Sequence, residues 1–125
     1  MNLSSRFLAI AVVYLMSGSV FGMVMGITHN FLEAPVHAHI VLLGWASLAL
    51  MGIIYRVYTE MAQKRLATAH FWLHNLGLPV MMVGQFLMLR GETSAQPIVA
   101  TGAVAVLLGI FCFVVNTMRS LLRAA

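Results

Sequence analysis

Four long hydrophobic runs without a charged residue occupy most of this 125-residue sequence. Each run holds at least 22 residues, whereas a helix needs about 20 to cross the apolar core of a bilayer, which is about 30 Å thick. A water-soluble bundle would show charged faces between its apolar stripes, and this chain, with 62% hydrophobic and 8% charged residues, shows none. We therefore predict an all-α integral membrane protein with spans at about 7–28, 34–56, 66–89 and 95–118.

The connections between these runs are short, with outer turns at 30–33 and 90–92 and an inner loop at 60–65. Short loops make successive helices antiparallel neighbours. We therefore predict one domain over residues 1–125, folded as an up-down four-helix bundle. Pro79 is expected to kink the third helix. The single cysteine, Cys112, is expected to be buried in the fourth helix, and it excludes an intrachain disulfide.

The basic residues predict the orientation in the membrane. With four spans, the two termini and the loop between the second and third spans lie on one side of the membrane. That side holds six of the seven basic residues: Arg6, Arg56, Lys64, Arg65, Arg119 and Arg123. The opposite side holds Arg90 alone, together with Glu33 and Glu92. The positive-inside rule therefore places both termini in the cytoplasm, and we expect a bacterial inner membrane. These flanks account for the formal charge of +4 and the pI near 10.0, so no nucleic-acid partner is needed.

Two histidines one residue apart, His37 and His39, lie just inside the outer end of the second span. An ionisable group inside a span is a functional hypothesis by default. Residues i and i+2 of an α-helix point about 200° apart, so these two imidazoles face opposite flanks and can each serve a different site. His29 ends the first span at the same face. The alternative is that these amphipathic residues simply sit at the membrane interface.

His70 and His74 lie four residues apart on one face of the third span, near its cytoplasmic start. Such a pair can bind a metal, or it can be solvated or hydrogen-bonded there. On ideal helices this pair lies more than about 10 Å in depth from the outer histidines, so the two groups are not expected to share one metal ion. Tyr55 and Tyr58 are expected in an inner aromatic belt.

Glycines offer flat surfaces beside the outer histidines. Gly18, Gly22 and Gly26 recur every four residues on the first span, a small-xxx-small pattern that lets a backbone or a flat ligand come close. Gly44 follows His37 by seven residues. Zinc takes three or four nearby ligands, and the spans contain no carboxylate. A haem b, which needs one or two axial histidines and an apolar slot, fits better than the alternatives, copper or zinc.

The residues from His37 to Trp45 read HAHIVLLGW. This segment, continuing to Tyr55, resembles the histidine-bearing helices of haem-copper oxidase subunit I, especially those of cbb3-type oxidases and nitric oxide reductases. There a His-x-His helix supplies ligands to two haems, and another helix supplies the second ligand of the low-spin haem. Residues 69–73, AHFWL, are similar to a His-Phe-Trp stretch in a later helix of the family.

The resemblance also implies an assembly. Family members have twelve spans in three four-helix groups, so a homotrimer of this chain would recreate that number around an axis. Each bis-histidine haem site would then take His37 from one chain and His39 from the next; the alternative is a site within one chain, formed by His29 and one of the pair. The chain lacks the adjacent His-His pair and the cross-linked His-Tyr element of the family, so a complete oxidase or reductase is not expected.

The sequence thus predicts a membrane haem b protein, oligomeric, for electron transfer with a redox partner protein or for haem or gas sensing. A second hypothesis is a transition-metal transporter or channel that uses the histidines as relay ligands: His29, His37 and His39 outside, His70 and His74 inside. The third is an accessory subunit that packs through its glycines and binds no ligand.

Overall fold

In the computed structural model, which describes residues 1–124, the chain is helical and that range contains no strand. Four helical segments have the length and apolar composition of membrane spans. The first is α1, Leu3–Thr28, the third is α5, Arg65–Leu89, and the fourth is formed by α6, Gln96–Ala124. The second span covers Ala34–Val57. The predicted all-α class is confirmed, and four helices long and apolar enough to span a membrane are present where the spans were predicted.

The second span was predicted as one regular α-helix, and the structure differs from this prediction. It begins as α2, Ala34–His39, continues as the π-helix η1, Ile40–Ser47, and ends as α3, Leu48–Val57. A π-helix pairs residue i with i+5 and often marks a functional site. Here it starts at the residue after His39, and it changes the register between the histidines and the rest of the span.

Helix ends and connections also extend beyond the uncharged runs. The Asn2 side chain accepts a hydrogen bond from the Ser5 backbone N–H at 2.9 Å and starts α1 before Arg6, because an N-cap can lie outside the apolar core. The predicted inner loop contains a short helix, α4, Thr59–Ala62. The turn before α6 contains the 3₁₀ helix η2, Thr93–Ala95.

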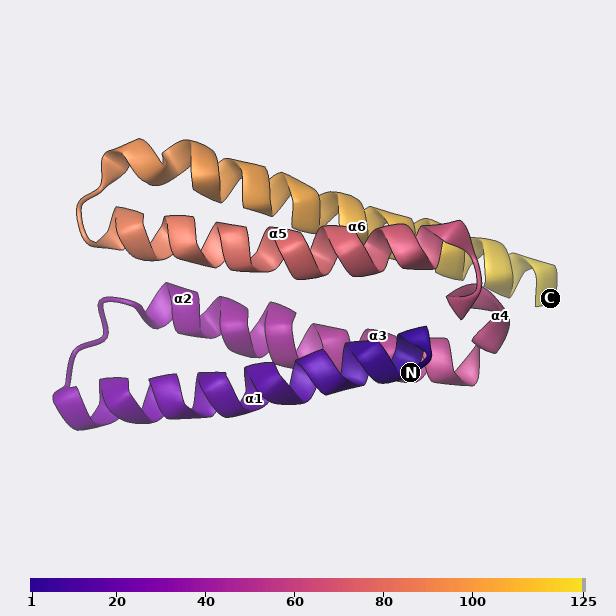
Figure 1. The fold of residues 1–125 in the computed structure, drawn as a ribbon, viewed down its shortest axis with the longest axis horizontal. Helices are drawn as coiled ribbons and strands as arrows, with labels where there is room; N and C mark the ends of the chain where they lie inside the picture. Colours follow the sequence, from indigo (N-terminus) through magenta and orange to yellow (C-terminus); the bar gives the residue numbers. More distant parts are fainter. Residues whose placement is uncertain (125) are drawn as a thin grey trace.

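The four spans form two helical hairpins, as Figure 1 shows. In the first hairpin α1 packs along the second span, and in the second hairpin α5 packs along α6. Successive spans run in opposite directions, as predicted, and both chain ends lie at the same end of the molecule (Figure 1). We call the opposite end, which holds residues 29–33 and 90–92, the distal end.

The hairpin of α5 and α6 depends on glycines spaced seven residues apart, Gly77 and Gly84 on one helix and Gly102 and Gly109 on the other. A methyl group at Gly77 would lie 2.7 Å from Ala105 Cβ, and one at Gly102 would overlap the backbone of Met81. The two backbones therefore approach more closely than any residue with a Cβ would allow. This is small-residue packing of the kind that joins helices in membranes.

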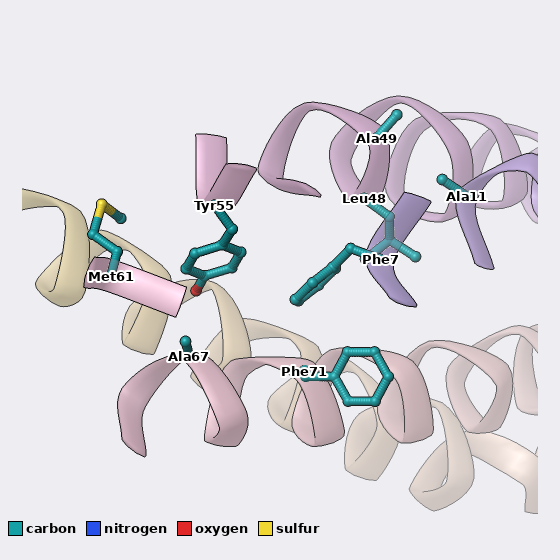
Figure 2. Packing of buried hydrophobic residues seen from close by; sticks show 8 residues of the cluster. All are labelled: Phe7, Ala11, Leu48, Ala49, Tyr55, Met61, Ala67 and Phe71. Atoms are coloured by element: carbon teal, nitrogen blue, oxygen red, sulfur yellow. The ribbon is translucent and has the colours of Figure 1, made fainter. Parts of the chain in front are cut away.

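The two hairpins meet around aromatic side chains near the end that holds the termini. Phe7 of α1, Tyr55 of α3 and Phe71 of α5 are buried together, and Figure 2 shows them between the helices. Their ring centroids are 5.4 Å apart for Phe7 and Tyr55 and 5.2 Å for Phe7 and Phe71. Tyr55 is only 1% exposed, so its predicted place in an aromatic belt is wrong. Cys112, predicted to be buried, is partly exposed.

Candidate functional site

His37 lies in the first turns of α2 with its ring against α1. A methyl group at Gly22 would lie 2.8 Å from His37 Cε1, and the Phe21 ring centroid is 6.3 Å from that of His37. His37 Nδ1 is buried and has no hydrogen-bond partner. Gly22 thus provides the close approach that the sequence predicted for the glycine pattern, and the group that uses it is an imidazole of the same chain.

His39 has a different environment, as its position two residues further along α2 predicts. Its Nδ1 lies 2.8 Å from the carbonyl oxygen of Pro35. A carbonyl can only accept, so Nδ1 carries the hydrogen and Nε2 carries a lone pair. Histidines that bind metals usually donate their other ring N–H to such a carbonyl, which fixes the ring and the tautomer. Nε2 is therefore the atom of His39 that could bind a metal.

The other predicted glycines divide into filled and open positions. A methyl group at Gly44 would lie 2.5 Å from Tyr14 Cγ, and one at Gly18 would lie 3.0 Å from Ile40 Cγ2, so side chains of this chain occupy both surfaces. At Gly26 nothing lies within 4 Å. Gly26 is therefore the position of the α1 pattern that is open to a partner helix or a flat ligand.

His29 is the C-cap residue of α1, is exposed, and has a left-handed backbone with φ of 51°. Over residues 1–124, no three or more His, Cys, Asp or Glu side chains are placed so that they could hold a metal ion together. One chain thus does not supply the set of ligands that a zinc site takes.

An apolar groove lies between α1, α2 and α5, and one of its lining residues, Phe21, has its ring centroid 6.3 Å from that of His37. The groove has a volume of about 240 Å³, and it is lined by Phe21, Val36, Met82, Val83, Phe86 and Leu87. Sites that bury a drug-sized ligand are about 300–1,000 Å³. The groove is smaller than such sites, so a single chain does not enclose a ligand of that size.

The structure places His70 and His74 in a second polar site, inside the protein. Both residues are 0% exposed, so the solvated alternative for this pair is excluded. His70 Nδ1 lies 3.0 Å from the Tyr55 hydroxyl, and His74 Nε2 lies 3.1 Å from the carbonyl oxygen of Leu43 in the π-helix. The two imidazole centroids are 5.5 Å apart.

Sequence reasoning missed Tyr55 and the Leu43 carbonyl as partners of these histidines. Tyr55 reads as a residue at a membrane boundary because Arg56 follows it, but the helix carries its ring inward, and Figure 2 shows the side chain directed from α3 toward α5. The Leu43 carbonyl has no signal in the sequence. Gly109 indicates only that α6 lies close to this part of α5, because a methyl group there would lie 3.1 Å from the backbone nitrogen of His74.

Fold and site together define an all-helical integral membrane protein with histidines inside two of its four spans. Comparison with known proteins adds no relative: no family model, curated protein or solved structure matches the chain.

Proposed function

We propose that this chain is a membrane haem b protein in which His37 and His39 are the axial ligands. His39 carries the proposal, because its Nδ1 is held by the Pro35 carbonyl and its Nε2 is left as a donor. His37 has a buried Nδ1 without a partner and lies on the opposite flank of the same helix. The sequence around these histidines resembles the histidine-bearing helices of haem-copper oxidase subunit I, and the proposal treats the chain as a minimal unit of that kind.

The residues of this chain would hold the group in complementary ways. The apolar groove between α1, α2 and α5 and the open position at Gly26 offer surfaces against which a flat ring can pack. Because one chain does not enclose the ring, we propose that a second copy completes the site, with His37 from one chain and His39 from the next. A closed cyclic oligomer repeats this contact at every interface, and a homotrimer is the form that the resemblance favours.

With His37 and His39 as the residues that would hold it, the haem would supply one-electron transfer chemistry. The function would then be electron transfer with a redox partner protein, or haem sensing, and gas sensing would require one ligand to leave. The predicted orientation would place this site near the outer face of a bacterial inner membrane, with both termini in the cytoplasm.

Substitution of the ligands tests the proposal. The variant His39→Ala should lose or convert the low-spin haem spectrum of the detergent-purified protein, because Nε2 of His39 is one of the two ligands. The variant His29→Ala is the control, since His29 is exposed at the same end, and it should keep the spectrum. An unchanged spectrum in His39→Ala would contradict the assignment.

The alternative function, a transition-metal transporter or channel, has one observation in its favour: histidines occur at two depths, as a relay requires. Each of the four spans is free of carboxylates, which would help to neutralise a divalent cation in hydrocarbon, and this favours haem. Uptake of zinc or copper into vesicles that contain the purified protein would support the alternative.

A further inference from the structure

His70 and His74 form a buried pair that the haem proposal does not use. They lie one turn apart on α5, and each has one ring nitrogen in a hydrogen bond. The other nitrogen of each ring, Nε2 of His70 and Nδ1 of His74, is buried without a partner. Buried polar atoms are normally hydrogen-bonded to protein, water or an ion, so two such atoms on imidazoles whose centroids are 5.5 Å apart need a partner.

The hydrogen positions favour a ligand that accepts electron pairs. The Leu43 carbonyl can only accept, so His74 Nε2 carries the hydrogen and Nδ1 carries a lone pair. The Tyr55 hydroxyl can accept from His70 Nδ1 or donate to it. The proposal takes the first form, in which His70 Nε2 carries a lone pair. Each ring is oriented by an oxygen on its far side, which is the arrangement that metal-ligating histidines show.

We propose that His70 Nε2 and His74 Nδ1 bind one monovalent copper ion, Cu(I). Two histidines four residues apart on one helix face can share a metal, and imidazole suits copper. Among residues 1–124 no group of three or more His, Cys, Asp or Glu side chains could hold a metal ion together. The two imidazoles are therefore the donor set of the proposal, and a two-coordinate d¹⁰ ion needs no more, whereas zinc takes four ligands.

Charge favours the monovalent ion too. The only acidic residues of the chain are Glu33, Glu60 and Glu92, and all three lie outside the four spans. A buried charge without a partner is costly in a membrane, so one positive charge is tolerated better than two. Binding is a ligand exchange: two nitrogen lone pairs replace the ligands that carried the ion, and no electron or proton is transferred.

A cavity of about 210 Å³ lies near this site, at the end that holds the termini. Its polar lining includes Tyr55 and Arg56 together with Asn2, Ser4, Thr59 and Gln63. Tyr55 therefore both lines this cavity and forms the hydrogen bond with His70.

The test is an anaerobic titration of the detergent-purified full chain with Cu(I), in competition with a colorimetric Cu(I) chelator. We expect one Cu(I) per chain, and X-ray absorption should show two nitrogen ligands at about 2 Å, the usual metal–nitrogen distance. Absence of binding by the wild type, a sulfur ligand, or a shell of four ligands would each overturn the proposal.

Substitutions test whether the Cu(I) ion is bound by His70 and His74. The variant His74→Ala should bind no Cu(I), and His29→Ala, at the distal end, should bind as the wild type does. Because both rings lie in the core, Tyr55→Phe provides a milder variant that keeps the ring and removes the hydroxyl; it should weaken binding about 10- to 100-fold. Unchanged affinity in both His74→Ala and Tyr55→Phe would overturn the site.

The copper site stands independently of the haem proposal. The variant His39→Ala should lose the haem spectrum and keep its one Cu(I), and loss of copper in that variant would overturn the assignment to His70 and His74.

Discussion

At the distal end, one ion pair joins the two hairpins. Glu33, before α2, accepts hydrogen bonds from Arg90 Nη2 at 2.7 Å and Nε at 2.9 Å. The Glu33 side chain is 6% exposed and that of Arg90 is 54% exposed. The Arg90 guanidinium also lies 4.5 Å from the Phe86 ring centroid. The Glu33 carboxylate, which water scarcely reaches, therefore depends on Arg90 to compensate its charge, whereas Arg90 is also in contact with water.

Removing the arginine should leave a buried carboxylate without a partner. We expect Arg90→Met to lower the free energy of unfolding by about 1–3 kcal/mol, the range for a hydrogen-bonded charged group left unsatisfied. Thermal unfolding in detergent measures this. In the double variant Glu33→Gln with Arg90→Met the loss should be smaller than in Arg90→Met alone, and Glu92→Gln, at an exposed residue of the same loops, is the control. Equal stability of Arg90→Met and wild type would contradict the role of the pair.

At the scale of the helices, the contact between α5 and α6 should be the least tolerant of added volume. In Gly102→Ala the new methyl group would overlap the Met81 backbone, and overpacking of this kind costs about 1–3 kcal/mol. In Gly26→Ala the methyl group meets nothing within 4 Å, and alanine is the better helix former by up to about 1 kcal/mol. Chemical unfolding should therefore show Gly102→Ala below the wild type and Gly26→Ala at or above it. The reverse order would contradict the packing described.

Some of these helices and helix contacts could be predicted from the sequence, and others could not. The four spans follow from polarity alone, because a long uncharged run has no stable place in water. The π-helix Ile40–Ser47 could not be predicted, since the change from i+4 to i+5 pairing leaves no pattern in a uniformly apolar segment. The spacing of seven between Gly77 and Gly84, repeated in Gly102 and Gly109, could have predicted the α5–α6 contact. The burial of His70 depends on Tyr55, fifteen positions away in sequence, and needs the fold.

At the scale of the whole molecule, the proposed haem site spans two chains, and a mixing experiment tests this. His37→Ala and His39→Ala chains should each bind little haem alone. Assembled together, an interface between the intact His37 of one variant and the intact His39 of the other restores a complete pair. Haem per chain should therefore rise in the co-expressed mixture. A mixture that binds no more haem than the separate variants would instead favour a site within one chain.

The most direct test of the central claim is a reduced-minus-oxidised visible spectrum of the detergent-purified wild-type protein. Ligation by His37 and His39 predicts the sharp α and Soret bands of low-spin haem b. A broad five-coordinate spectrum would contradict the bis-histidine site, and a colourless protein from haem-replete cells would contradict haem binding altogether.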